Sequence, residues 1–224
     1  MMSRVPLALL GAVVLAAGMH TAALRGLADA HYTNARLTLA GSAAEKRGAR
    51  PEELSYALAS VRQALQFEPS NPGFVEQSAR LRELRALGLP AGDPGIREGL
   101  RQSLAQFREA AVMRPGSPFV WASIAMLKVR LNDMDFELYG ALERAARLGP
   151  WEPQVQIAII DVGLAAWPWL ARSGRVRVLE ALERALLRQE PEVRRIAAIH
   201  GTLPRVCASA TPALPRLGAL CARK

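Results

Sequence analysis

The side chains that could carry out acid–base chemistry or bind a metal ion are few and widely spaced in this chain of 224 residues. The three histidines, each without a second ligand at suitable spacing, are His20, His31 and His200. A metal centre would need several such ligands close together. Three aspartates fall near the expected ends of helices, where capping is their usual role: Asp133, Asp135 and Asp161. The sequence therefore predicts no catalytic residue, no metal site, no cofactor and no enzymatic activity.

The two cysteines, Cys207 and Cys221, lie together near the C-terminus in a segment with three prolines. A cysteine pair in a proline-rich tail, with none in the body, favours a disulfide formed in an oxidising compartment. Closing such a loop contributes on the order of 3 kcal/mol. Two unpaired thiols in a cytosolic protein are the alternative.

Three Pro-x-x-Pro motifs, at residues 69–72, 115–118 and 150–153, separate apolar stretches that have helical spacing. Proline ends a helix, yet it fits the first turn of the next one because its missing N–H has no partner there. Each motif is therefore predicted to form a tight corner between two helices.

Apolar or small residues recur five, eight and twelve positions before the first proline of each motif, and Glu190 takes the proline's place in a fourth copy. The positions are Ala64, Ala110, Ala145 and Ala185 (five), Val61, Phe107, Leu142 and Leu182 (eight), and Ala57, Ser103, Leu138 and Val178 (twelve). These offsets share one helix face. The pattern predicts an all-α protein built from about four helical hairpins.

Helices are expected near residues 27–45, 52–68, 73–87, 95–114, 118–131, 134–148, 153–166, 174–189 and 192–199. No stretch alternates apolar and polar residues over the length of a strand. We expect three segments: a cytoplasmic tip and membrane anchor (1–26), a helical repeat domain (27–200) and an irregular tail (201–224).

The repeat resembles the tetratricopeptide repeat at one set of residues: Trp121, Ala125, Leu138, Leu142, Ala145 and Pro150. This resemblance implies an α-solenoid of tetratricopeptide-like hairpins, an architecture that usually binds partners. An ordinary all-α bundle with accidental repetition is the alternative.

Residues 5–24 contain no charged side chain and match the length of a membrane-spanning helix. A cleaved signal peptide is the alternative, with small residues at 16–18 and 21–23 as candidate cleavage sites. We favour a retained anchor, because the apolar run passes these sites. Together with the cysteine pair, this predicts a single-pass inner-membrane protein whose body lies in the periplasm.

The formal net charge of +9 comes almost entirely from arginine, and the arginines alternate with glutamates along the helices. This arrangement is typical of an ion-paired, solvated surface. A nucleic-acid site would combine clustered cations with stacking aromatics. We therefore expect protein partners and no nucleic acid.

The segment around the third corner carries more polar and aromatic side chains than the repeat requires. We predict a recognition surface at Trp151, Glu152, Gln154 and Gln156, because tryptophan is favoured at binding hot spots. Residues expected to point outward from a concave face are Arg80, Lys128, Arg130 and Gln156. One alternative is that Trp151 packs over the third and fourth hairpins; another is that Trp151, Trp167 and Trp169 bind a glycan.

Residues 141–145, 148–156 and 163–167, together with the N-terminal span, resemble the VpsP family of membrane-anchored, repeat-containing accessory proteins of bacterial exopolysaccharide clusters. The resemblance implies a scaffold or adaptor in exopolysaccharide biosynthesis or export, and it transfers no catalytic residue. The alternatives are a glycan-binding module, a glycan-modifying or lytic enzyme, and an assembly factor for another envelope complex, in cytochrome maturation or secretion.

Overall fold

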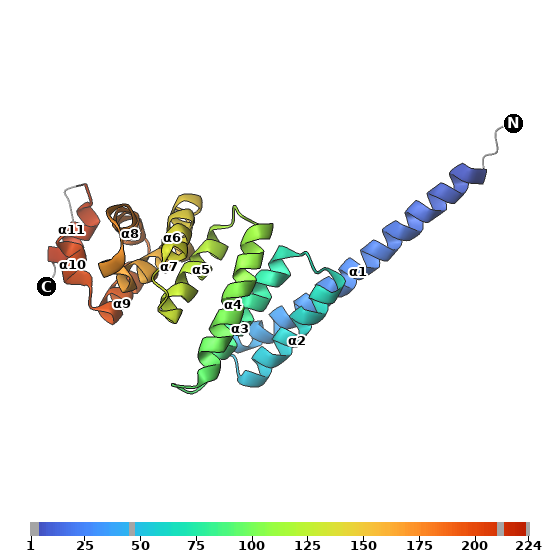
Figure 1. Ribbon diagram of the computed structural model, residues 1–224, viewed down its shortest axis with the longest axis horizontal. Helices are drawn as coiled ribbons and strands as arrows, with labels where there is room; N and C mark the ends of the chain where they lie inside the picture. The colour runs from blue at the N-terminus through green and yellow to red at the C-terminus, as the bar shows by residue number, and fades with distance from the viewer. Residues whose placement is uncertain (1–4, 45–47, 210–212, 223–224) are drawn as a thin grey trace. The chain divides into compact units, whose positions relative to one another are not determined.

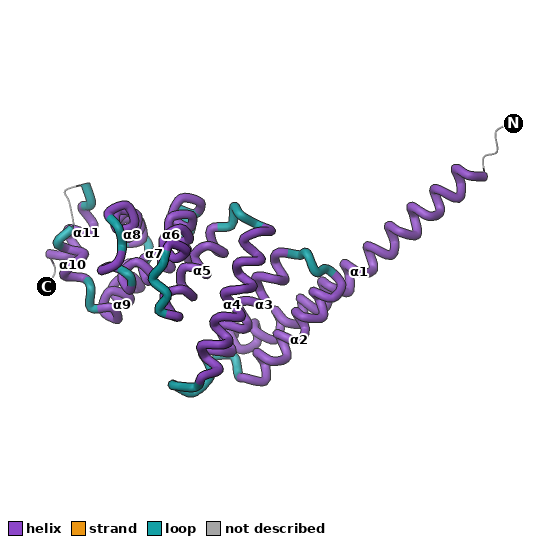
Figure 2. The backbone as a smooth tube through the Cα atoms, viewed as in Figure 1, coloured by secondary structure: helices purple, strands orange, loops and turns teal. Residues whose placement is uncertain are grey.

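The computed structural model describes residues 5–44, 48–209 and 213–222, and all regular structure within these ranges is helical (Figure 1). Figure 2 shows the same ranges as helices joined by short loops, with no strand among them. The prediction of an all-α protein is confirmed.

The helices predicted between residues 52 and 200 are all present, with ends that differ from the prediction by only a few residues. The bounds are α1 (Val5–Ala44), α2 (Pro51–Phe67), α3 (Pro72–Leu87), α4 (Pro94–Met113), α5 (Pro118–Leu131), α6 (Phe136–Leu148), α7 (Pro153–Ala165), the 3₁₀ helix η1 (Trp167–Trp169), α8 (Arg172–Ala185), α9 (Glu190–His200), α10 (Leu203–Cys207) and α11 (Pro215–Ala222).

The chain forms two compact units, Met1–Gly99 and Leu100–Lys224. The first contains α1, α2, α3 and the start of α4 up to Gly99, and the second contains the remainder. The three-segment organisation expected from the sequence remains a prediction.

Helix α1 of the first unit has two parts with different surroundings. The side chains between Leu9 and Ala23 are exposed on every face of the helix. Farther along, Ala28 and Ala35 are fully buried in the cluster formed with α2 and α3. The ring of Tyr32 lies 4.9 Å from that of Phe74 in α3. The second half of α1 is therefore part of the folded unit, while the first half extends from it (Figure 1).

In the second unit, α5 packs on α6 and α7, and α7 also packs on α6, α8 and α9. Helices thus contact both their neighbour and the next helix but one. The repeated positions five, eight and twelve residues before each corner contribute to the cores of both units: each of the twelve side chains is at most 2% exposed. The sequence pattern therefore identified the buried face of each of these helices.

The Pro-x-x-Pro corners share one hydrogen-bond pattern. The residue before the first proline donates its N–H to the carbonyl of the repeated alanine: Glu68 to Ala64 (3.0 Å), Arg114 to Ala110 (2.8 Å) and Gly149 to Ala145 (3.0 Å). Gln189 repeats this bond to Ala185 (2.7 Å) without a proline after it. The residue before the second proline then closes the turn: Asn71 to Glu68 (3.2 Å), Ser117 to Arg114 (3.1 Å) and Glu152 to Gly149 (3.2 Å).

The turn between α5 and α6 depends on Asn132, whose φ of 62° lies in the left-handed region that asparagine tolerates. This conformation lets Asp133 N–H donate to the carbonyl of Lys128 (2.9 Å), which closes the end of α5. Asp135 then caps α6 by accepting from the N–H groups of Glu137 (3.1 Å) and Leu138 (3.2 Å). The chain therefore reverses within a few residues.

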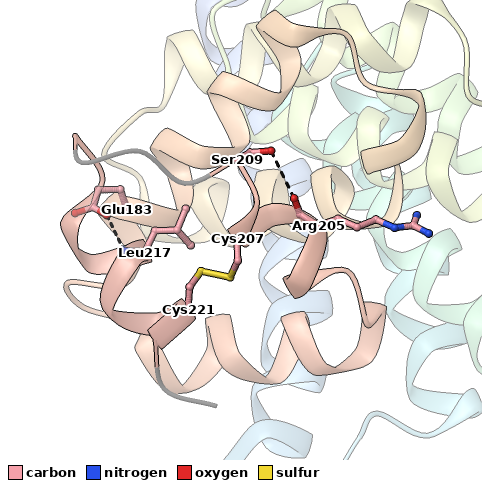
Figure 3. The surroundings of a disulfide bond; sticks show 6 residues. All are labelled: Glu183, Arg205, Cys207, Ser209, Leu217 and Cys221. Carbon is pink, nitrogen blue, oxygen red and sulfur yellow. Dashed lines mark hydrogen bonds between the residues drawn. A yellow bond between two sulfur atoms is a disulfide. The ribbon is translucent and has the colours of Figure 1, made fainter.

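The tail was expected to be irregular, and this prediction is wrong because α10 and α11 are helical. Pro204 and Pro215 lie in the first turns of these helices, where proline is compatible with helix formation. Cys207 of α10 and Cys221 of α11 are joined by a disulfide, with 5.7 Å between their Cα atoms (Figure 3).

A carboxylate of α8 caps α11. Glu183 of α8 accepts hydrogen bonds from the N–H groups of Arg216 (3.1 Å) and Leu217 (2.9 Å), two donors that a first helical turn leaves unpaired. Figure 3 shows Glu183 directed at Leu217, whose side chain is fully buried. The disulfide joins α10 to α11, and the cap attaches α11 to α8.

Candidate functional site

The corner between α6 and α7 carries the most exposed tryptophan of the second unit. Trp151 is 70% exposed and follows directly on Pro150. The guanidinium carbon of Arg184, on α8, lies 5.6 Å from the centre of its ring. Glu152 and Gln154 are exposed beside it. Three of the predicted partner-binding residues therefore share one accessible corner. The alternative, in which Trp151 packs over the third and fourth hairpins, remains open.

The corner is held in place from two sides. A Cβ added to Gly149 would lie 2.7 Å from Cβ of Pro118, so the end of α6 closely approaches the start of α5. Gln189 donates from Nε2 to the carbonyl of Pro153 (3.2 Å), which ties the start of α7 to the segment after α8. A side chain mounted on such a fixed corner loses little conformational freedom when it binds a partner.

Gln156 was predicted to lie on this surface, and its outward orientation is wrong. It is 5% exposed, and its Nε2 donates to the carbonyl of Pro150 at 2.7 Å. Trp121 stands at the same offset after its own motif and donates from Nε1 to the carbonyl of Pro115 at 2.8 Å. Gln156 therefore has the same structural role at its corner as Trp121 has at the preceding one. Its position three residues after the second proline, the same as that of Trp121, could have shown this from the sequence.

Lys128 was also predicted to point outward, and this is wrong too, because it is 3% exposed. Its Nζ contacts three carboxylates of the following segment: Asp135 at 2.6 Å, Glu137 at 3.4 Å and Asp133 at 3.6 Å. Glu137 also forms a paired hydrogen bond with Arg108, 2.7 Å from Nε to Oε1. The buried ammonium is thus neutralised within the α5–α6 hairpin.

The contacts within this cluster shift the pKa values of Lys128, Asp135 and Glu137. Burial alone would lower the pKa of Lys128, but the hydrogen bond to Asp135 and the nearby carboxylates raise it. Partial burial would raise the pKa of Asp135, but the hydrogen bond from Lys128 lowers it. The hydrogen bond from Arg108 is the main cause of the lowered pKa of Glu137.

We expect the cluster to make the protein less stable in acid. A carboxyl group whose pKa is lowered by folding contributes stability above its unfolded pKa, which is about 3.9 to 4.3 for Asp and Glu. That contribution disappears as the pH falls through the folded pKa. Glu137→Gln should therefore be less stable than wild type at pH 7, and the difference should shrink as the pH falls below about 4.3. Urea unfolding at a series of pH values measures it.

The matched control for this series is Glu109→Gln, which changes an exposed glutamate of α4. Its difference from wild type should stay small and constant across the pH range. A Glu137→Gln difference that does not change with pH would contradict the role given to the cluster.

The predicted binding residues do not form one surface. Arg130 is exposed but lies with Lys128 near the α5–α6 turn. Trp151 lies at the other end of α6, whose 13 residues span about 20 Å. Arg80, in the first unit, is exposed and lies 3.7 Å from Glu76. The site supported by position is the corner formed by Trp151, Glu152 and Gln154.

The other tryptophans differ from one another in exposure. Trp167 is 3% exposed, so its ring is not available to a glycan, whereas Trp169 is 56% exposed. A pair that sequence reasoning did not identify links α9 to α7: His200 Nε2 contacts Asp161 Oδ1. This pair joins two helices that also pack on each other, and we interpret it as a structural link.

Comparisons with protein-family models, with curated proteins and with solved structures found no match to this chain.

Proposed function

We propose that the protein is a membrane-anchored helical scaffold that acts by protein–protein interaction in bacterial exopolysaccharide biosynthesis or export. The observation that carries the proposal is the exposed apolar half of α1, continuous with a half that packs in the first unit. The polysaccharide context comes from the resemblance of residues 141–145, 148–156 and 163–167 to the VpsP family. A deletion strain with unchanged capsule or matrix would contradict this context.

Helix α1 is long and apolar enough to cross a membrane, by length and composition. Leu10 and Met19 are each more than 60% exposed, although they lie on opposite faces of the helix. A helix that is apolar on all sides is favoured in a hydrocarbon environment. Residues 5–24 span about 30 Å, the thickness of the hydrocarbon core. The next residue, Arg25, pairs with Glu68 of the folded unit at 3.1 Å.

We expect Val14→Arg to weaken membrane insertion, because arginine at the centre of a spanning helix costs about 2.5–3.5 kcal/mol. Fractionation after carbonate extraction measures the result, with part of the chain moving from the membrane to the soluble fraction. Leu37→Arg is the matched control, since Leu37 is 65% exposed and lies beyond the proposed span. Equal membrane retention of both variants would contradict an anchor at residues 5–24.

We place the amino end in the cytoplasm and the body in the periplasm. The disulfide between Cys207 and Cys221 supports this assignment, because disulfides persist in oxidising compartments. The test is a fusion, after Lys224, to a reporter that works only in the cytoplasm. Activity of this fusion would overturn the orientation. The mass of the mature chain distinguishes a retained anchor from a cleaved signal peptide.

We further propose that the helical hairpins form a tetratricopeptide-like solenoid. Ion pairs between helices support this, because they recur at equivalent positions with their charges exchanged. Arg108, seven residues before Pro115, pairs with Glu137, thirteen before Pro150. Glu143, seven before Pro150, pairs with Arg177, thirteen before Glu190. Equivalent positions that meet in successive copies indicate a repeated packing step.

The partner-binding surface of the scaffold is the corner of Trp151, Glu152 and Gln154. We expect Trp151→Ala to weaken capture of an envelope partner by about thirtyfold, the effect of losing a hot-spot side chain worth about 2 kcal/mol. The melting temperature should stay unchanged, because Trp151 is 70% exposed. Trp169→Ala is the matched control, because it removes another exposed tryptophan that is not part of the proposed partner-binding corner. A lower melting temperature with intact capture would assign Trp151 to packing.

Glycan binding is the second candidate function, favoured by the exposed rings of Trp151 and Trp169. Retention of the purified full chain on purified polysaccharide, in the absence of other proteins, would support it over the scaffold.

A further inference from the structure

The second unit contains a groove whose lining does not include Trp151, Glu152 or Gln154. It is formed by the C-terminal half of α4, the first turns of α5 and the exposed side of α6, and its cavity has a volume of about 520 Å³. The residues that line it and that carry the argument below are Arg108, Val112, Trp121, Glu137, Arg144 and Arg147. We call it the α4–α6 groove.

The floor of the groove is apolar. Trp121 lines it beside Ile124, which is 1% exposed. Val112, on α4, is 83% exposed at its edge, and Leu148, on α6, is 38% exposed. A single exposed valine is ordinary, but four apolar side chains around one cavity favour an occupant with an apolar side chain.

The rim of the groove is positively charged. Arg108 is compensated by Glu137. Arg144 instead lies over the ring of Trp121, with its guanidinium carbon 4.4 Å from the ring centre. Within the ranges that the structure describes, no carboxylate is paired with Arg144 or Arg147. Guanidinium groups form strong paired hydrogen bonds with carboxylates, so this rim favours an acidic occupant.

The next copy of the repeat shows what fits such a place. Arg144 and Arg184 stand at the same offset, six residues before Pro150 and Glu190. Beside Arg184 lies the indole of Trp151, the residue after Pro150. The corresponding residue after Pro115 is Gly116, which has no side chain. The α4–α6 groove therefore has no side chain at the position that Trp151 occupies in the next copy, and its Arg144 lies over Trp121 instead.

We infer that the α4–α6 groove binds an acidic segment of a partner protein, with a large apolar side chain against Trp121 and Val112 and flanking carboxylates on Arg144 and Arg147. A sugar is a poorer match, because Arg144 already covers one face of Trp121. The inference rests on the proposed function only in treating the chain as protein-binding. It requires neither the Trp151 corner nor the membrane anchor.

The test uses the full chain in detergent micelles and a fluorescent synthetic peptide with one tryptophan flanked by glutamates on both sides. Fluorescence anisotropy should show saturable binding, and a peptide with lysines in place of the glutamates should not bind. Arg147→Glu should weaken binding about tenfold or more, since loss of a charge-assisted contact is worth about 1.5–3 kcal/mol.

Gly116→Trp is the sharpest variant, because it adds an indole at the position that Trp151 occupies in the next copy and should abolish peptide binding. A Cβ at Gly116 would have nothing within 4 Å, so a side chain can start at this position without a clash. Gly116→Ala is its matched control and should bind as wild type does. Trp151→Ala should also leave peptide binding unchanged, which separates this site from the proposed partner-binding corner.

Circular dichroism and thermal unfolding establish whether each variant is folded. If Gly116→Trp does not fold, Arg147→Glu tests the inference alone, because Arg147 is exposed. No saturable binding of the acidic peptide would overturn the inference. Equal binding by wild type and Arg147→Glu would overturn it as well. Self-association of the chain that Gly116→Trp disrupts, without peptide binding, would assign the groove to a second copy and would also overturn it.

Discussion

Phe107→Ala should lower the free energy of unfolding by about 3–5 kcal/mol, because it removes a fully buried aromatic side chain and leaves a cavity. Phe107 is 0% exposed and stands eight residues before its corner, the position where the other copies carry Val61, Leu142 and Leu182. The loss tests whether this repeated position contributes to the core in the way its burial implies. Urea unfolding of the full chain in detergent, followed by circular dichroism, measures it.

Val112→Ala is the matched control for Phe107→Ala. It shortens another apolar side chain of α4, but one that is 83% exposed, so its effect should stay within about 0.5 kcal/mol. Losses of similar size at the two positions would contradict the buried face assigned to α4.

The sequence was most informative where one physical cause acts locally. Proline in the first turn of a helix and a small residue at a fixed offset each need only a few neighbours to be interpreted. The helices from α2 to α9 could therefore be predicted almost to their ends. The same rule applied to Pro204 and Pro215 would have predicted α10 and α11, which were instead expected to be irregular.

The candidate site was harder to predict, because burial of a polar side chain depends on partners outside its own helix. Lys128 looks like a surface residue until Asp135 and Glu137 return across the Asn132 turn and pair with it. Gln156 looks like a surface amide until its offset is compared with that of Trp121. In both cases the polar atom was satisfied within the fold, which removes the cost of burying it.

The pairing of helices was not accessible from composition at all. The ion pair of Glu143 with Arg177 joins residues 34 positions apart, and the contact of His200 with Asp161 joins residues 39 apart. Periodicity identifies which face of a helix is buried, but it does not specify which other helix covers that face. The α4–α6 groove depends on such pairing, so no sequence motif marked it.

Gly163→Val should destabilise the second unit by about 3 kcal/mol, the upper end of the usual effect of overpacking. A Cβ at Gly163, in α7, would lie 2.2 Å from Cγ2 and 2.7 Å from Cγ1 of Val178. Val178, in α8, is fully buried and stands at a repeated core position. Its β-branched side chain has little rotamer freedom with which to move aside. Either α7 or α8 must therefore shift. Urea unfolding measures the resulting decrease in the free energy of unfolding.

A double-mutant cycle isolates this contact. Val178→Ala removes both methyl groups that crowd Gly163, so Gly163→Ala should cost less in its presence than alone. Gly140→Ala is the matched control: it lies within α6 with nothing within 4 Å of an added Cβ, and it should raise stability by about 0.5–1 kcal/mol through helix propensity. Additive effects of Gly163→Ala and Val178→Ala would show that α7 and α8 do not approach as closely as described.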